Sequence, residues 1–141
     1  FGVPRRTAIG LDPNRLALLV AVLEKKMGIP LGEQDIFVNA AGGLRVTETA
    51  VDLGVIASIA SSFYDKPLAP EMVVFGEVGL AGEVRGVMQS DLRVQEAARM
   101  GFTACVCPAK HQIRPKTSHP FKLHFVENVR DALKNLLKLS I

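Results

Sequence analysis

The chain has 141 residues, of which 48% are hydrophobic, 6% aromatic and 22% charged, and its formal net charge is +3. This length suits one domain, and the scarcity of aromatic residues predicts a core of aliphatic side chains and alanines. No apolar run is long enough to cross a bilayer, and no signal-peptide pattern is present. We therefore expect a cytoplasmic protein without membrane contact. The mild basic excess permits binding to nucleic acid without demonstrating it.

The first third of the chain predicts a helix followed by a strand. Asp12 is a candidate N-cap, Pro13 takes the first helical position, and leucines and valines recur at helical spacing up to Gly28. Apolar residues then alternate over residues 36–40, which predicts a strand. Residues 44–46 are predicted to begin the return strand of a hairpin, because two glycines separate them from that strand.

An almost uncharged apolar segment at residues 50–63 predicts a helix buried at the centre of the domain, with Thr47 and Thr49 as candidate caps. A mixed order of strands and helices follows, which predicts the α+β class, a mixed sheet with packed helices. The later elements are strands at 72–75, 104–107 and 122–126, a glycine-rich hairpin at 76–85, a helix ending at Gly101, and a last helix capped by Asn128.

The two cysteines, Cys105 and Cys107, lie two residues apart in an apolar run. A strand places them on one face, but such close neighbours rarely form a disulfide and lack the spacing of a zinc pair. We predict two buried free thiols. His111, His119 and His124 match no metal motif, so we predict no metal site in this chain.

Glycines at positions 76, 79 and 82 alternate with apolar residues. A phosphate-binding loop would need Lys-Ser or Lys-Thr at the start of a helix, and no lysine occurs between Lys66 and Lys110. We therefore assign these glycines to the geometry of a hairpin and predict no nucleotide site here.

Several motifs carry a resemblance to a known family. They include Pro4-Arg-Arg-Thr-Ala-Ile-Gly10, Val38-Asn-Ala-Ala-Gly-Gly-Leu-Arg45, Ile59-Ala-Ser-Ser62 and the block from Gly76 to Arg85. The block resembles the proteolytic domain of the Lon family. Across nearly the whole chain, the motifs more closely resemble the Lon-like C-terminal domain of the bacterial RadA (Sms) family. This resemblance implies the Lon-protease-like fold, of the ribosomal protein S5 domain 2 type.

The resemblance also implies a function. RadA-type proteins are RecA-like, ATP-dependent DNA repair proteins that act in homologous recombination and branch migration. Their Lon-like domain is an inactive scaffold that supports a hexameric ring and contacts DNA. Residues 1–10 would then be a connector from a missing N-terminal ATPase domain, and residues 11–141 the Lon-like domain. ATP, magnesium and zinc are expected only in the missing part. The implied partners are further copies of the chain, single-stranded or branched DNA, and a RecA-type recombinase.

Lon peptidases use a serine nucleophile and a lysine base, and the resemblance puts Ala50 and Asp91 at these two positions. Alanine has no nucleophile, and a carboxylate cannot replace a neutral amine. No serine lies between Arg45 and Ser58, and no lysine lies between Arg85 and Arg99. We predict no catalytic residues and no peptidase activity.

No acidic residue lies between Ala97 and Val126, and several cations do. Exposed cations neutralise phosphates and release counterions, so we take this segment and the basic pair near the N-terminus as candidate DNA contacts. An ordinary solvated loop is the alternative. The candidates are Arg5, Arg6, Arg114, Lys116 and Lys122.

Asp52 is unusual because it lies within the apolar helix, where an unpaired carboxylate is costly. We predict a structural salt bridge with Arg45 or Arg85, or contact with a neighbouring subunit. Glu77 is predicted to cap a turn or to meet an arginine across an interface.

Two other functions remain open at the level of sequence. One is a peptidase with a different dyad, for which Ser58, Ser61 or Ser62 with Lys66 would be the nearby material. The other is an oligomerisation module without DNA binding.

Overall fold

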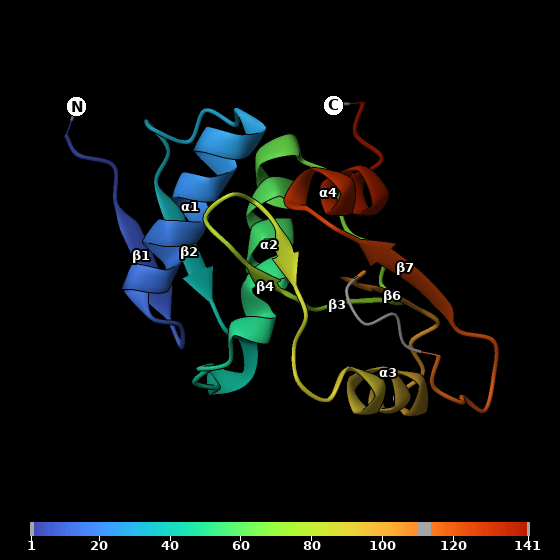
Figure 1. Cartoon of the computed structure of the whole chain (residues 1–141). Helices are drawn as coiled ribbons and strands as arrows, with labels where there is room; N and C mark the ends of the chain where they lie inside the picture. The colour runs from blue at the N-terminus through green and yellow to red at the C-terminus, as the bar shows by residue number, and fades with distance from the viewer. Residues whose placement is uncertain (1, 110–113, 141) are drawn as a thin grey trace.

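The strands of this domain gather in small sheets around a central helix (Figure 1). The computed structural model describes residues 2–109 and 114–140. Its elements in chain order are β1 (Arg6–Ile9), α1 (Pro13–Met27), β2 (Ile36–Asn39), the 3-10 turns η1 (Ala41–Gly43) and η2 (Thr49–Val51), α2 (Asp52–Tyr64), β3 (Met72–Val74), β4 (Glu77–Val78), β5 (Val84–Arg85), α3 (Ser90–Arg99), β6 (Ala104–Pro108), β7 (Lys122–Val126) and α4 (Val129–Leu137).

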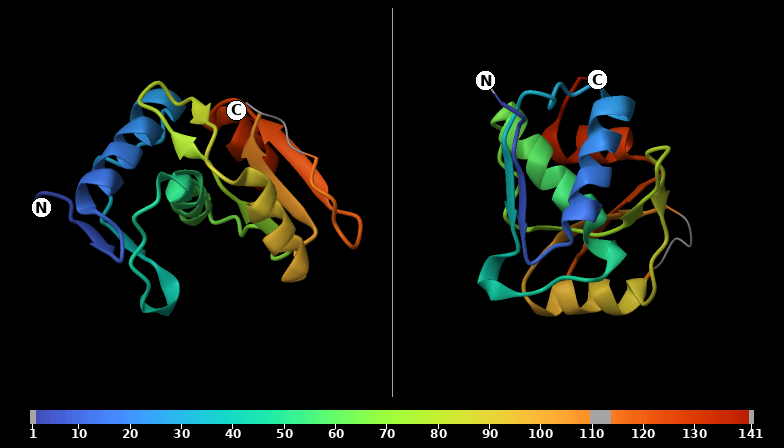
Figure 2. Two further views of the ribbon diagram at one scale, coloured as in Figure 1. Left: turned by 60° about the horizontal axis from the view of Figure 1, so that its bottom comes forward. Right: turned by 90° about the vertical axis from the view of Figure 1, so that its left-hand side faces the viewer.

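The described strands pair in separate sheets rather than in the one mixed sheet that was predicted. Strand β1 pairs with β2 in a parallel arrangement. A parallel sheet contains β3, β6 and β7 in that order, and an antiparallel pair consists of β4 and β5. The fold is mixed α/β and compatible with the α+β class. In Figures 1 and 2, α2 lies between the β1–β2 pair and the β3–β6–β7 sheet.

The prediction of a hairpin after β2 was wrong. Residues 41–43 form the turn η1, and residues 44–46 form no strand, although the Val46 amide donates to the Gly10 carbonyl at 2.7 Å. The partner of β2 is β1, which lies in the segment interpreted as a connector. Parallel strands need a long crossover, and α1 supplies it, so the pairing could not be read from neighbouring residues. The division into connector and domain stays a prediction.

The start and end of α1 are as predicted. The Asp12 carboxylate accepts a hydrogen bond from the Asn14 amide at 2.9 Å, and Gly28 ends the helix in the left-handed conformation. The predicted caps of α2 were wrong, because neither Thr47 nor Thr49 caps the helix. The turn η2 precedes the helix instead, and the Thr49 hydroxyl donates to Glu77 at 3.0 Å.

The main core lies between α1, α2 and α4 and is aliphatic, as predicted. Helix α2 contributes most of its length to this core, but Ser58 and Ser62 lie on an exposed face, so the helix is not buried on every side. A second, smaller core cluster includes Phe75, Val94 and both cysteines. None of the helices in the described part of the chain is long and apolar enough to cross a membrane.

The glycine-rich segment forms the predicted hairpin, β4–β5. Gly82 has a φ of 82°, which side chains disfavour, and a Cβ added at Gly79 would lie 2.2 Å from the Glu83 carboxylate. The later elements also follow the prediction. Strand β6 buries both free thiols, β7 covers the predicted residues, and the Asn128 side chain caps α4 by accepting from the Asp131 amide at 2.8 Å.

Candidate functional site

The position expected for a Lon nucleophile holds a buried methyl group. Ala50 lies in η2 directly before α2 and is 6% exposed. Its carbonyl accepts from the Gly76 amide at 2.9 Å, and the Gly76 carbonyl accepts from the Leu53 amide at 3.0 Å. The glycine-rich hairpin is therefore fixed to the start of α2, and no side chain at this point can attack a substrate.

The position expected for the Lon base is a carboxylate at the surface. Asp91 lies in the first turn of α3 and is exposed. A catalytic lysine of the Lon kind works because apolar surroundings remove its charge, and neither the side chain nor the environment at Asp91 provides this.

The alternative serines do not form a Ser–Lys pair among the described residues. The Ser58 hydroxyl donates to the Gly54 carbonyl at 2.8 Å, and the Ser61 hydroxyl donates to the Lys66 backbone carbonyl at 2.5 Å. Ser62 and Lys66 are both exposed. Both of these hydroxyls are therefore engaged in hydrogen bonds to nearby backbone carbonyls.

The buried carboxylate of Asp52 has a different partner from those predicted. Asp52 is fully buried, and the Arg15 guanidinium donates to it through Nε at 2.9 Å and through Nη2. The Val78 amide also donates to the carboxylate, at 3.0 Å. The bond to Asp52 raises the pKa of Arg15. A structural salt bridge was predicted correctly, but neither Arg45 nor Arg85 forms it.

This cluster joins elements that are distant in the sequence, because Arg15 lies on α1, Asp52 on α2 and Val78 on β4. The position of Arg15 beside the core can be read from the sequence, but its pairing with Asp52 across two helices cannot. Arg15 directly precedes Leu16, a buried residue of the α1 stripe, so its stem starts at the edge of the core. Arg45, by contrast, is exposed in the loop between η1 and η2.

Both hairpin glutamates contact Arg85 of the same hairpin, whereas the prediction for Glu77 was a turn cap or an arginine across an interface. Arg85 Nη1 lies 3.7 Å from Glu77, and its Nη2 lies 3.0 Å from Glu83. Glu83 also accepts from the Ala81 amide at 3.1 Å, and backbone hydrogen bonding followed by the bond from Arg85 lowers the pKa of Glu83. These contacts define the hairpin conformation.

The candidate DNA contacts occupy two separate regions. Strands β1 and β7 lie at opposite sides of the domain in Figures 1 and 2, so the pair Arg5 and Arg6 is remote from the residues of the β7 region. Arg6 is half-buried, and its guanidinium donates to the carbonyls of Leu31, at 2.9 Å, and Gln34. Arg5 is exposed. Of this pair, Arg5 is the more available to a phosphate.

In the β7 region, Arg114, Lys116 and Lys122 are all exposed. The Arg114 guanidinium lies 4.7 Å from the centre of the Phe125 ring, a cation–π contact. Lys110 and His111, which belong to the basic interval noted in the sequence, lie outside the described residues.

Sequence reasoning missed a further part of this positive surface. His124 follows Lys122 by two residues on β7, and burial together with the charges of Lys122 and Lys138 lowers the pKa of His124. Lys138 immediately follows α4. Helix α4 packs against β7, so Lys138 adds its charge to this region, whereas the lowered pKa of His124 favours the neutral form of that ring. The pairing of β7 with α4 is tertiary, so charge counting along the chain could not reveal the contribution of Lys138.

The described residues thus define a mixed α/β domain without a Ser–Lys pair, and they contain no cluster of residues suited to a metal ion. No protein-family model matches the chain.

Three curated relatives are each named DNA repair protein RadA. The chain is 48% identical over 134 residues to that of Halalkalibacterium halodurans, 45% over 130 residues to that of Escherichia coli, and 45% over 137 residues to that of Bacillus subtilis. These matches cover 95%, 92% and 97% of this chain, but only 29%, 28% and 30% of the relatives. The chain is a relative of the RadA proteins and spans about 30% of their length, which confirms the resemblance inferred from the motifs.

Proposed function

We propose that this chain is a catalytically inactive, Lon-like scaffold domain of a RadA-type DNA repair ATPase. The observation that carries the proposal is the 45–48% identity to proteins named DNA repair protein RadA, over more than nine-tenths of this chain. Ala50 supports the inactive state, because it places a methyl group where a Lon peptidase has its nucleophile. The Lon-like fold itself is part of the proposal.

The whole protein, in this proposal, is cytoplasmic and acts in homologous recombination and branch migration. ATP, Mg²⁺ and Zn²⁺ belong to its other parts, and a RecA-type recombinase is a further partner. The domain described here contributes ring contacts and DNA contacts rather than chemistry.

The DNA contact rests on the exposed cations of the β7 region. Arg114, Lys116 and Lys122 should bind phosphates rather than bases, because they are cations at an exposed surface and the Phe125 ring beside them already faces the Arg114 guanidinium. Binding should be weak, independent of DNA sequence and strongly reduced by salt.

The test is a fluorescence titration of labelled single-stranded and branched DNA at two salt concentrations. Replacing Arg114, Lys116 and Lys122 together with alanine should weaken binding at least tenfold at low salt. It should also reduce the slope of the logarithm of the binding constant against the logarithm of the salt concentration by about two to three. The matched control replaces Lys25, Lys26 and Lys66, three lysines outside the β7 region, and should change binding far less. If the β7-region mutant binds as tightly as the parent chain, a scaffold without DNA binding becomes the better description.

Ring formation is supported by the exposed apolar side chains Leu80, Met88, Leu92 and Met100, on or near the hairpin and α3. In a ring, two different surfaces of one copy meet, so oligomers should grow with concentration toward a closed size of six. Light scattering over a concentration series measures this. A monomer at every concentration up to the millimolar range would contradict the scaffold role.

A further inference from the structure

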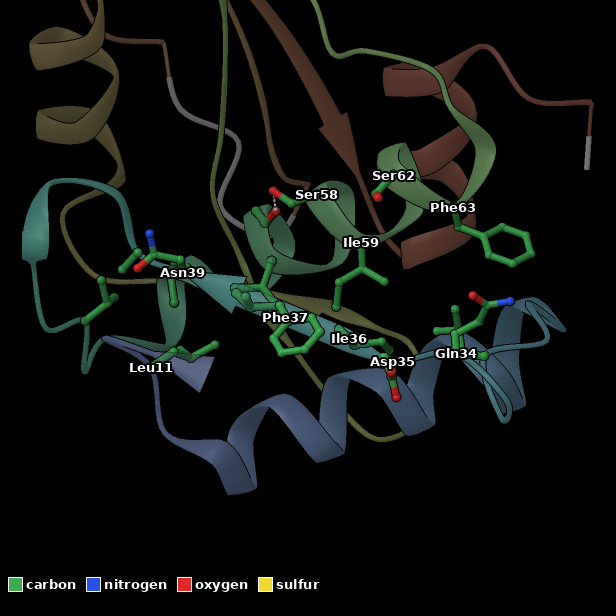
Figure 3. A pocket seen from close by; sticks show the side chains of 17 residues that line it. Leu11, Gln34, Asp35, Ile36, Phe37, Asn39, Ser58, Ile59, Ser62 and Phe63 are labelled. Atoms are coloured by element: carbon green, nitrogen blue, oxygen red, sulfur yellow. Dashed lines mark hydrogen bonds between the residues drawn. The ribbon is translucent and has the colours of Figure 1, made fainter. Parts of the chain in front are cut away.

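A groove of about 690 Å³ lies between β2 and α2, away from Ala50, Asp91 and the basic residues of the β7 region (Figure 3). This volume falls within the range of about 300–1,000 Å³ that is usual for ligand sites. Figure 3 shows Ser58, Ile59, Ser62 and Phe63 of α2 along one side and Phe37 of β2 along the other.

One wall of the groove is the open edge of a strand. The Ile36 and Ala40 amides donate to Arg5 and Ile9 at 2.9 Å, so alternate residues of β2 are bonded to β1. In a parallel ladder, the residues between them direct their N–H and C=O groups to the other side. Phe37 and Asn39 therefore present backbone donors and acceptors away from β1, and within residues 2–109 and 114–140 no second strand pairs with β2.

The opposite wall of the groove is formed by α2, whose small residues leave space for a ligand. Gly54, Ser58 and Ser62 follow one another at intervals of four residues, which places three small residues on one face of α2, and all three line the groove. Val55 and Ile59 also line it, and since each is only 7% exposed they form its apolar floor. Phe37 is 65% exposed and Phe63 is 36% exposed, so two aromatic rings border the groove with much of their surface in water.

The charge of the lining selects the kind of occupant. Asp35 is the single charged residue among the described residues that line the groove, and no lysine, arginine or histidine is among them. A phosphate backbone would meet a carboxylate and no cation here, which makes nucleic acid a poor ligand. A polypeptide in extended conformation matches both the backbone edge and the apolar wall.

The shape of the groove favours a single extended segment over a second folded copy of the chain as its occupant. Helix α2 flanks the open edge, so the groove admits one extended segment but not a sheet edge that carries its own covering helices. β2 has four residues and spans about 13 Å at about 3.3 Å per residue, so a segment of about four to six residues fills it.

We propose that this groove binds an extended, uncharged or basic peptide segment of a partner protein, which adds to the open edge of β2 as a further strand. Main-chain bonds to Phe37 and Asn39 hold the segment, and alternate side chains of the segment contact Val55 and Ile59. This site is separate from Arg114, Lys116 and Lys122 of the β7 region, so its test does not depend on DNA binding by those residues.

The first step of the test is selection from a phage-displayed random dodecapeptide library on the full 141-residue chain. The Ser58→Trp variant, whose indole fills the groove, serves as the counter-target, and Gln95→Trp on the exposed face of α3 is the matched control. Peptides should be enriched on the parent chain and on Gln95→Trp but not on Ser58→Trp. They should alternate apolar residues with polar or basic ones.

The second step isolates the strand edge. Phe37→Pro removes one edge donor that β1 does not use, and Phe37→Thr removes the ring but keeps the donor. With both variants checked by circular dichroism, calorimetry should show at least tenfold weaker binding of a selected peptide to Phe37→Pro than to Phe37→Thr. A copy of the peptide that is N-methylated at alternate residues should also bind at least tenfold more weakly.

Three results would overturn the proposal. They are an absence of peptides that distinguish the parent chain from Ser58→Trp, equal binding to Phe37→Pro and Phe37→Thr, and equal binding of the N-methylated peptide. If Ser58→Trp instead lowers self-association in sedimentation velocity while no peptide is selected, a second copy occupies the groove and the peptide proposal fails.

Discussion

At the scale of single residues, the contact between Arg15 and Asp52 joins α1 to the start of α2. Among the described residues, Asp52 is the one charged residue that is buried. Its carboxylate accepts hydrogen bonds from the Arg15 guanidinium and from the Val78 amide. A buried ion pair contributes little net stability when both partners are present, but removing one partner leaves the other charge in the core without compensation.

Replacing Asp52 with alanine leaves the Val78 amide and the Arg15 guanidinium, which is 25% exposed, without their acceptor, and should lower the free energy of unfolding by about 2–4 kcal/mol. Urea denaturation followed by circular dichroism measures the change. Asp91→Ala is the matched control, since that carboxylate is exposed, and its effect should stay within about 0.5 kcal/mol. A loss below 1 kcal/mol in Asp52→Ala would show that the pair does not stabilise the junction of α1, α2 and β4.

At the scale of elements, local patterns predicted the elements better than their partners. The boundaries of α1, β7 and α4 follow from caps and spacing that lie within a few residues, and the structure confirms them. The pairing of β1 with β2 depends on residues that α1 separates, and the sequence offered only an assumed hairpin in its place. The same reason explains why Arg15 and Lys138 were missed, since both act across elements.

The packing of α4 beside β7 makes a prediction about pH. Burial and the charges of Lys122 and Lys138 lower the pKa of His124, so the unfolded chain takes up a proton more readily than the folded chain. Stability should then fall as the pH drops through the ordinary histidine pKa of about 6.5. His124→Gln should reduce this loss, as measured by urea denaturation at pH 7.5 and pH 5.5.

His119 provides the opposite control. Its ring nitrogens lie 2.9 Å from the Ala98 carbonyl and 3.1 Å from the Pro120 carbonyl, and these contacts raise the pKa of His119. Its contribution to stability is present below the ordinary pKa and disappears as the pH rises through the folded value. His119→Gln should therefore increase the loss at pH 5.5. If His124→Gln increased the loss at pH 5.5 as His119→Gln does, the environment assigned to His124 would be wrong.

At the scale of the whole molecule, the arrangement of the start of α2, the hairpin and α3 determines what chemistry the domain can perform. The resemblance points to Ala50 and Asp91, and the structure shows that the first is buried and the second lies at the surface. Replacing Ala50 with serine would give the chain a nucleophile but no base. The activity of a Ser–Lys pair needs both groups and a desolvated amine.

The chain should therefore show no hydrolysis of fluorogenic peptides, and Ala50→Ser should not introduce any. The double variant Ala50→Ser with Asp91→Lys should also remain inactive, because a lysine in the exposed first turn of α3 stays solvated and keeps its proton. Parallel assays of ATP hydrolysis should be negative too, since the chain has no phosphate-binding loop. A different result would be peptide hydrolysis that survives further purification and disappears when Ser58, Ser61 or Ser62 is replaced with alanine. That result would show that the domain uses a different nucleophile and is not an inactive scaffold.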